Sequence, residues 1–373
     1  MVRPATVSVD ELPLSTATKL NSKSRILSIQ ALRGVAAMVV AFYHLHHVEN
    51  KYFATHTTGA LQYGWMGVDL FFVISGVVIS LVTAGKFQNR PNAFRFLYHR
   101  LARIFPIYWV YYFIVLAAYL YNPMWISAAT GHHLDVWPSF FLLPCYSMVV
   151  GQAWSLSYEL YFYLAFFLIL LFVPERYVLH ALAAWGGIIC LFECFLRPQY
   201  QHYVLWLLTD TFLYEFLLGC VLLHIFRRFE FAARTGGAMV LLSIAWFGAW
   251  VILTSTMHGG NSDWIKNSYW MRPLCCGVTG FLLLFGIMVM ERAGAFKVNK
   301  ALSDLGDWSY SIYLSHQIVV ELVGRIVARF FDFYYAIFLV EVIAIPAVVL
   351  VGYCSYRWLE NPVLHYLYRR SES

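Results

Sequence analysis

The chain has 373 residues, of which 61% are hydrophobic and only 12% are charged, with a formal net charge of +6. A typical soluble domain is about 25% charged, so this balance excludes a water-soluble globular protein. The mean hydropathy of +0.63 and repeated apolar runs of about 20 residues indicate an integral membrane protein. No alternation typical of membrane β-strands occurs, so the predicted fold class is all-α.

Residues 1–24 differ from the rest of the chain. They are polar and rich in Ser and Thr, and they lack the apolar core of a cleavable signal peptide. We expect a flexible cytoplasmic tail here, one integral-membrane domain over residues 25–366, and a short cytoplasmic tail over residues 367–373. The first membrane span itself would act as the targeting signal.

The apolar runs predict a polytopic membrane helix bundle of about ten spans. The expected spans are residues 29–47, 64–84, 104–121, 154–173, 178–196, 203–226, 237–254, 270–290, 308–328 and 334–356. One further stretch, 137–150, is short and contains Pro138 and Pro144. We interpret it as a short re-entrant or interfacial segment.

The Lys and Arg residues orient the bundle. With ten spans and a cytoplasmic N-terminus, 19 of the 26 Lys and Arg residues fall on the cytoplasmic side, 4 on the other side and 3 within spans. Counting 137–150 as a span would move Arg227, Arg228 and Arg234 outside, against the positive-inside rule. We therefore predict that both termini are cytoplasmic.

The cysteines and the positive charge do not indicate a metal site or a nucleic-acid partner. Six of the seven cysteines fall in predicted spans, Cys145 lies near a boundary, and the sequence has no CxxC pair. We expect neither a disulfide framework nor a bound metal. The sequence also lacks a basic patch interleaved with stacking aromatic residues, so no nucleic-acid partner is expected.

Two ionisable residues, Arg33 and His44, lie in the first span, eleven positions apart. Eleven residues make about three helical turns, so both side chains share one face and lie about 16 Å apart along the axis. Ionisable groups in lipid are costly, which favours a functional place inside the bundle. The alternatives are that Arg33 snorkels to the headgroups and that His44 is an interfacial helix-end histidine.

Two carboxylates are expected at the depth of His44. The second and fourth spans both run inward, which puts Asp69 and Glu159 in the outer third of the membrane. Neutral His44 is suited to take a proton from a hydroxyl, and either carboxylate would orient its ring. The alternative roles are a structural acceptor for Asp69 and a complement to the helix dipole for Glu159.

Arg100 and Arg103 precede the third span and are three residues apart, so they share one helix face. Such a pair is suited to hold phosphates from the cytosol, and the alternative is a pair of positive-inside anchors. With Arg33 they predict a site that has a positively charged opening on the cytoplasmic side and an acid–base cluster near the outer leaflet. This polarity suits a coenzyme A thioester, which has a charged head and a long thin arm.

Further ionisable residues within the spans favour buried pairing. Glu321 and Arg325 are four residues apart and predict an ion pair on one helix. His316 lies mid-span and is as consistent with a hydrogen-bonded core histidine as with a site residue.

Six motifs resemble, in order, those of the acyltransferase-3 family of integral-membrane acyltransferases. They are LRGVAAMVVAFYH with Arg33 and His44, GVDLFFVISG, RLAR with Arg100 and Arg103, WSLSYE ending at Glu159, LGDWSYSIYLSH ending at His316, and SYRWLENP. The resemblance covers residue 26 to about residue 366. It implies acyl-CoA at the cytoplasmic face and a catalytic role for the histidine of the first span.

The residues and the resemblance together predict an O-acyltransferase of the bacterial inner membrane. It would move an acyl group, with acetyl preferred, from acyl-CoA to a hydroxyl of a cell-surface or exported carbohydrate. Its expected site residues are catalytic His44, Glu159 and Asp69 and coenzyme-binding Arg33, Arg100 and Arg103. The expected partners are membrane lipid, a carbohydrate or lipid-linked glycan, and proteins of a polysaccharide assembly pathway.

Two alternative functions stay open. One is acylation of a small cytoplasmic acceptor such as a macrolide, which the resemblance also implies. The other is a proton-coupled transporter or channel with a relay of intramembrane His, Asp and Glu. The sequence shows no inverted repeat and no pair of broken helices, which argues against transport. Coenzyme A binding would favour the enzyme, whereas substrate flux without such binding would favour the transporter.

Overall fold

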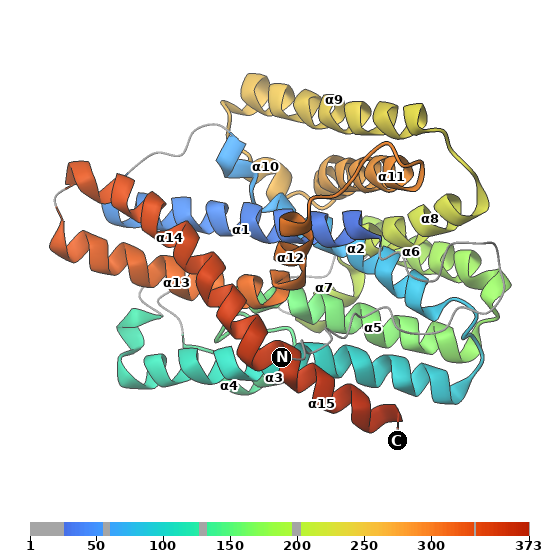
Figure 1. Cartoon of the computed structure of the whole chain (residues 1–373), viewed down its shortest axis with the longest axis horizontal. Helices are drawn as coiled ribbons and strands as arrows, with labels where there is room; N and C mark the ends of the chain where they lie inside the picture. The colour runs from blue at the N-terminus through green and yellow to red at the C-terminus, as the bar shows by residue number, and fades with distance from the viewer. Residues whose placement is uncertain (1–25, 55–59, 127–132, 196–202, 332, 373) are drawn as a thin grey trace, which may run out of the picture.

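The computed structural model describes residues 26–54, 60–126, 133–195, 203–331 and 333–372. These residues form helices and loops without strands, which confirms the all-α prediction. Most of the long helices run across the page in Figure 1. The predicted tail over residues 1–24 lies outside the described residues.

The helices follow one another with short connections. In chain order they are α1 Leu27–Phe53, α2 Met66–Thr83, α3 Arg90–Tyr121, α4 Val136–Phe140, α5 Trp154–Phe172, α6 Val178–Phe195, α7 Tyr203–Thr209, α8 Leu213–Arg228, α9 Ala233–His258, α10 Asp263–Lys266, α11 Val278–Arg292, α12 Lys300–Asp307, α13 Ser309–Phe330, α14 Phe333–Ser355 and α15 Asn361–Glu372. Four 3-10 turns (Ala60–Tyr63, Pro123–Trp125, Gly151–Ala153 and Glu175–Tyr177) and two π-helical turns (Pro273–Gly277 and Tyr356–Glu360) complete the described elements.

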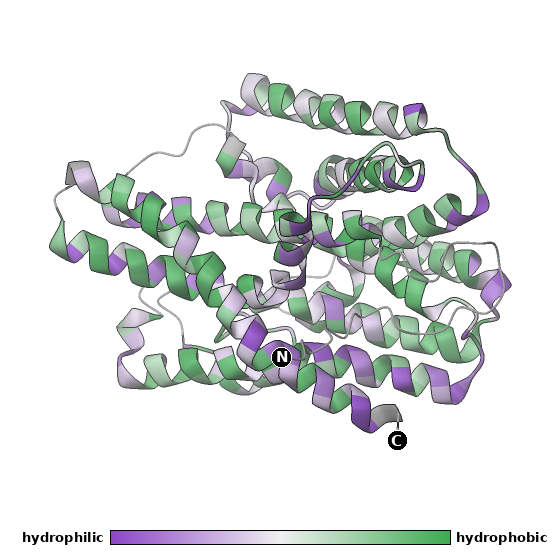
Figure 2. Ribbon diagram, viewed as in Figure 1, coloured by the Kyte–Doolittle hydropathy of each residue, from purple (hydrophilic) through white to green (hydrophobic). Residues whose placement is uncertain are grey.

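Ten stretches of the described chain are long and apolar enough to cross a membrane. Each overlaps one of the ten predicted spans, so the predicted number is confirmed and the protein is an integral membrane protein. Figure 2 shows that α9, α11 and α14 are mainly hydrophobic, whereas α12 and α15 carry many hydrophilic residues. On α9, large apolar side chains such as Leu241, Ile244 and Met257 are exposed, as expected for a surface facing lipid.

The sixth predicted span is interrupted, which the sequence did not reveal. It consists of α7 and α8, separated at Asp210. The Asp210 carboxylate accepts the backbone N–H of Phe212 at 3.0 Å and the hydroxyl of Tyr158 at 2.6 Å. Because a local side-chain acceptor competes with helical hydrogen bonding, α7 ends at Thr209.

The stretch 137–150 forms no spanning helix, in agreement with its interpretation as a short segment. Only α4 is helical, and α3 binds its carbonyl groups. The donors are Tyr108 Oη to Ser139 O at 2.5 Å, Tyr112 Oη to Val136 O at 2.9 Å and Trp109 Nε1 to Phe140 O at 3.1 Å. These bonds satisfy carbonyl groups for which lipid would offer no donor.

Helix α1 lies at the centre of the packing and contacts α2, α12 and α13. Its first turn is held by Glu291 of α11, whose carboxylate accepts the backbone N–H groups of Leu27 at 2.8 Å and Ser28 at 3.0 Å. Helix α12 packs so closely that a Cβ at Gly306 would lie 1.9 Å from the carbonyl oxygen of Gln30. Only glycine permits this approach, which fixes the turn of α1 that carries Arg33.

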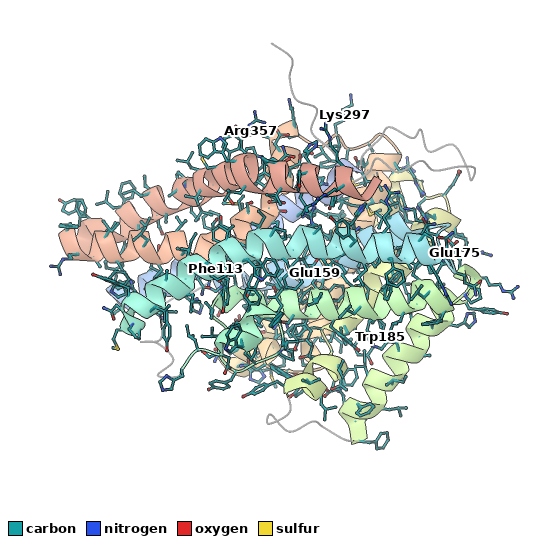
Figure 3. All side chains as sticks on the ribbon, turned by 90° about the horizontal axis from the view of Figure 1, so that it is seen from below. Phe113, Glu159, Glu175, Trp185, Lys297 and Arg357 are labelled. Atoms are coloured by element: carbon teal, nitrogen blue, oxygen red, sulfur yellow. The ribbon has the colours of Figure 1, made fainter. Side chains whose placement is uncertain are left out.

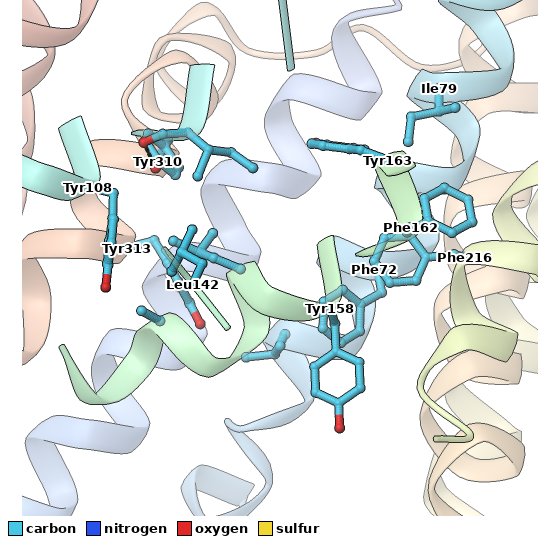
Figure 4. Close-up of a cluster of buried hydrophobic side chains, with 14 of the residues drawn as sticks. Phe72, Ile79, Tyr108, Leu142, Tyr158, Phe162, Tyr163, Phe216, Tyr310 and Tyr313 are labelled. Carbon is cyan, nitrogen blue, oxygen red and sulfur yellow. Dashed lines mark hydrogen bonds between the residues drawn. The ribbon is translucent and has the colours of Figure 1, made fainter. Parts of the chain in front are cut away.

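An aromatic cluster fixes α5 against α2 and α8. The ring of Phe216 stacks on Phe72 at 4.7 Å and on Phe162 at 4.2 Å between centroids. Figure 4 shows these rings beside Tyr158 and Tyr163. Both tyrosines lie on α5, as Phe162 does. The cluster therefore sets the position of Glu159, which lies on α5 between these two tyrosines.

Candidate functional site

Arg33 and Arg103 meet in a polar pocket beside the first turns of α1. The pocket combines residues of α1, α3, α12, α15 and the second π-helical turn. Its lining is Gln30, Arg33, Arg103, Asp307, Tyr356, Glu360, Asn361, Leu364, His365 and Tyr368. Arg33 Nη1 donates to Gln30 Oε1 at 3.4 Å. The structure thus brings together two of the three arginines predicted to hold a coenzyme.

Glu360 is one of two carboxylates in the pocket lining, with Asp307. It is 1% exposed, and its Oε2 accepts the Ser311 hydroxyl at 2.7 Å. Its charge acts on both Arg33 and Arg103. Glu360 lies on the π-helical turn that ends α14, and such turns recur at functional sites. Its motif, SYRWLENP, resembles one of the family, but no role was predicted for Glu360 itself. The available signal was an acid four residues after the end of the last predicted span.

Glu159 belongs to the same charge cluster. It accepts hydrogen bonds from Tyr163 Oη and, at 3.5 Å, from Ser75 Oγ. Its charge also acts on Arg33 and Arg103. Figure 3 shows Glu159 in the middle of the bundle, away from Glu175 at one end. Glu159 thus faces the middle of α2 at Ser75, and its expected depth beside His44 stays a prediction.

Arg100 lies outside the lining of the pocket. It is 7% exposed, and its guanidinium group lies 5.6 Å from the ring centre of Phe96 and 5.7 Å from that of Tyr163. The predicted pair is therefore divided: Arg103 faces the pocket, whereas Arg100 packs against aromatic rings. Tyr163 connects Arg100 to the charge cluster, because its hydroxyl donates to Glu159.

His44 lies farther along α1 among other rings. The ring centroid of His316 is 5.1 Å away, that of Tyr43 is 5.3 Å away, and that of His47 is 6.2 Å away. Lys266 Nζ donates to Tyr43 Oη at 2.8 Å, and its charge acts on His44. Among the contacts of the described residues, none joins His44 to Asp69 or Glu159.

Asp69 is held by Arg272. Arg272 Nε donates to Asp69 Oδ1 at 2.7 Å, and Nη2 donates to Oδ2 at 3.1 Å. Asp69 is 0% exposed, and the guanidinium group lies 4.0 Å from the ring centre of Phe212. This geometry matches the structural alternative for Asp69. The sequence placed Arg272 in a span but offered no means of choosing its partner.

One face of α13 connects the pocket with His44. Tyr310, Tyr313 and His316 are spaced three residues apart on this face. Tyr310 Oη donates to Ile104 O at 2.7 Å, and the Tyr313 hydroxyl lies 2.6 Å from Ser155 Oγ. The charge of Glu159 acts on both tyrosines. Buried polar groups therefore lie along this face of α13, from Tyr310, on which the charge of Arg103 acts, to His316 beside His44.

Two further expectations concern ion pairs and metals. Arg325 Nε donates to Glu321 Oε1 at 2.8 Å, which confirms the predicted pair, and Lys51 Nζ donates to the same oxygen at 2.7 Å.

Within the described ranges, no group of three or more His, Cys, Asp and Glu residues is arranged to hold a metal ion.

Comparison with known proteins decides the family. A sequence profile of the acyltransferase domain, Acyl_transf_3, matches residues 26–357. The chain belongs to this family. The profile covers all the ionisable residues predicted for the site, from Arg33 to Glu159, so the resemblance found in the motifs is confirmed.

Several relatives of this acyltransferase-family chain are similar over most of its length. O-acetyltransferase OatA of Staphylococcus aureus is 24% identical over 375 residues, covering 92% of this chain and 58% of OatA. Exopolysaccharide production protein ExoZ of Rhizobium meliloti is 26% identical over 310 residues, covering 81% of this chain and 90% of ExoZ. The putative membrane-bound transacylase BcsY of Komagataeibacter xylinus is 24% identical over 364 residues, covering 92% of this chain and 84% of BcsY.

The chain therefore spans about three fifths of the length of OatA. No solved structure matches the chain.

Proposed function

We propose that the chain transfers an acyl group, with acetyl preferred, from acyl-CoA to a hydroxyl of a cell-surface or exported carbohydrate. The pocket of Arg33 and Arg103 would open to the cytoplasm in the bacterial inner membrane, with both termini on that side. The excess of Lys and Arg on the predicted cytoplasmic side supports this orientation.

The observation that carries the proposal is the division of α1 into two chemical environments. Arg33 lies with a second guanidinium group in a polar pocket, and His44 lies eleven residues later beside His316. The two positions are about 16 Å apart along the helix. A donor with an anionic head and a thioester at the end of a long arm suits this separation.

The donor would be held through its phosphates. Arg33 and Arg103 present guanidinium groups, whose fixed donors match phosphate oxygens in pairs. The charges of Glu360 and Glu159 act on both arginines and oppose theirs. Arg100 would support the site by packing on Tyr163, which donates to Glu159. The predicted coenzyme role of Arg100 is therefore an indirect one in this proposal.

His44 would act as the general base. As the acceptor hydroxyl attacks the thioester carbonyl, its proton passes to the free ring nitrogen of His44. A C–O bond forms, the C–S bond breaks, and the proton then passes from His44 to the departing thiolate, which leaves as coenzyme A. This sequence requires no covalent intermediate on the protein. Asp69 and Glu159 would act by holding the helices and the arginines rather than by contacting His44.

A carbohydrate is the proposed class of acceptor. ExoZ is named for exopolysaccharide production and OatA for O-acetyl transfer, and both are similar to this chain over most of its length. These names support an exported glycan over a small cytoplasmic acceptor such as a macrolide. Other proteins of a polysaccharide assembly pathway would supply the glycan.

The test measures O-acyl groups on cell-surface polysaccharide by proton NMR. A strain lacking the gene is compared with strains restored with the wild type, with His44→Ala or with His180→Ala at equal membrane abundance. His180 is an exposed residue of α6 and serves as the matched control. We expect acylation with the wild type and His180→Ala but not with His44→Ala. Full acylation with His44→Ala would exclude His44 as the base, and no signal with the wild type would exclude a surface glycan as the acceptor.

A further inference from the structure

His316 has one ring nitrogen without a partner. The residue is 0% exposed, and its Nδ1 lies 2.6 Å from the carbonyl oxygen of Tyr313 and 3.3 Å from that of Ile312. Because carbonyl oxygens only accept hydrogen bonds, Nδ1 carries the proton and Nε2 keeps its lone pair. Nε2 is buried and has no hydrogen-bond partner among the described residues.

An acceptor without a donor is unusual in a protein interior and calls for a reason. The neighbouring tyrosine is not available as a donor, because the Tyr313 hydroxyl already bonds to Gln152 O at 2.9 Å and to Ser155 Oγ at 2.6 Å. The ring of His44 is the remaining neighbour with an N–H, at 5.1 Å between centroids and 46° between planes. A hydrogen bond between the two rings requires a rotation of the His44 side chain that directs an N–H at Nε2.

The other groups around His44 already have partners. Lys266 donates to Tyr43 Oη at 2.8 Å, and His47 Nδ1 lies 3.1 Å from Tyr43 O. Among the contacts of the described residues, neither carboxylate expected at His44 reaches it: Asp69 pairs with Arg272, and Glu159 accepts from Tyr163. The bond of His47 Nδ1 to a carbonyl also leaves His47 Nε2 as an acceptor, but His47 is exposed and its ring is farther from His44, at 6.2 Å. His316 is thus the buried group beside His44 with an open acceptor.

We propose that His316 is the positioning partner of His44 in acyl transfer. One N–H of His44 donates to His316 Nε2, which leaves the other nitrogen of His44 as the base. When that nitrogen takes the hydroxyl proton, the bond to Nε2 becomes charge-assisted and stabilises the imidazolium. No proton passes to His316, whose ring orientation is fixed by the two carbonyl groups. The catalytic part of this inference rests on the proposed function.

Two substitutions separate this role from a merely structural one. In His316→Gln the side-chain amide reaches the position of Nε2 and keeps an acceptor for His44. In His316→Asn the amide reaches only the position of Nδ1 and keeps a donor for the carbonyl groups. The purified proteins are reconstituted in liposomes and assayed with acetyl-CoA and polysaccharide from the strain lacking the gene, after their thermal unfolding midpoints have been measured.

The expected result is that His316→Gln keeps kcat within about threefold, whereas His316→Asn loses about 100-fold in kcat at an unchanged KM for acetyl-CoA. The opposite order, with Asn active and Gln inactive, would show that His316 only anchors the helix. Wild-type kcat in both variants would equally overturn the proposal.

A second measurement decides the pairing without relying on turnover. Solid-state NMR of the wild-type protein labelled with ¹⁵N-histidine follows the Nε2 resonance of His316, assigned by its loss in His316→Gln. On acidification His44 takes a proton, and the hydrogen bond that His316 Nε2 accepts from it becomes stronger. We therefore expect the Nε2 resonance to move upfield while Nε2 itself stays unprotonated. We expect no such movement in His44→Ala. A resonance that does not move, or that moves equally in His44→Ala, would exclude the pair. If the wild type transfers no acyl group, the proposed function fails, and this spectrum still decides whether the two histidines pair.

Discussion

Asp69 and Arg272 form a buried ion pair in which both carboxylate oxygens accept guanidinium N–H groups, at 2.7 Å and 3.1 Å. The pair joins α2 to the residue just before the π-helical turn that begins the eighth span. Phe212 and Trp65 lie over the guanidinium group at 4.0 Å and 4.8 Å, so the charge of Arg272 is shielded from lipid. This pair accounts for the carboxylate that the sequence analysis placed beside His44.

Removing the charge of Asp69 should therefore destabilise the protein rather than impair its chemistry. Asp69→Asn removes the charged hydrogen-bond partner of a buried guanidinium group, and we expect the free energy of unfolding to fall by about 3 to 5 kcal/mol. Thermal unfolding in detergent measures this change, with the exposed residue Asp263→Asn as the control. An unchanged stability together with a loss of kcat would instead return Asp69 to the catalytic group.

Arg103 and Arg100 should differ in their effect on donor binding. Arg103 lines the pocket, whereas Arg100 packs on Phe96 and Tyr163. Losing a charged hydrogen bond costs about 1.5 to 3 kcal/mol, so Arg103→Gln should raise the KM for acetyl-CoA roughly 10- to 100-fold. Arg100→Gln should raise it less and should lower the unfolding midpoint more. Equal increases in KM for both variants would mean that the two arginines hold the donor together.

Neutralising Glu159 should change donor affinity. Glu159 balances the charge of Arg33 and Arg103, so Glu159→Gln should leave the pocket more positive and lower the KM for acetyl-CoA about two- to tenfold. Glu175→Gln, at an exposed position, is the control. Steady-state kinetics in liposomes measure both. A loss of 100-fold or more in kcat at constant KM would support the role at His44 that the sequence suggested.

The contact between α12 and α1 should tolerate no side chain. Gly306→Ala would place a Cβ 1.9 Å from Gln30 O, and relieving this clash should cost about 1 to 3 kcal/mol and move the turn that carries Arg33. Gly237→Ala on α9 meets no atom within 4 Å and should stabilise its helix by about 0.5 to 1 kcal/mol. Thermal unfolding compares the two. A Gly306→Ala protein as stable as Gly237→Ala would contradict the close packing of α12 on α1.

Sequence periodicity and hydropathy predicted most of the fold. Ten apolar runs became ten candidate spans because membrane helices must satisfy their own backbone hydrogen bonds. The break at Asp210 escaped because it depends on one side chain competing for a backbone N–H within an otherwise apolar run.

The sequence predicted which residues belong to the site, but not which of them contact one another. Helical spacing placed Arg33 and His44 on one face of the first span. Asp69, Glu159 and His44 were grouped only because their predicted depths in the membrane are similar. Which carboxylate meets which cation depends on helix rotation and on where an irregular turn falls, and neither is visible in a hydropathy pattern. The roles of Arg272, which directly precedes the first π-helical turn, and of Glu360, the last residue of the second, were therefore found only in the structure.

The central claim is that α1 separates donor binding from proton transfer, and one kinetic comparison tests it most directly. Initial rates with acetyl-CoA and isolated polysaccharide are measured for the wild type, Arg33→Gln and His44→Gln in liposomes, with exposed Arg329→Gln and His180→Ala as controls. Arg33→Gln should raise the donor KM roughly 10- to 100-fold with kcat largely kept. His44→Gln should lower kcat at least about 100-fold with the donor KM kept. A His44→Gln protein with wild-type kcat, or an Arg33→Gln protein with an unchanged KM, would contradict the account.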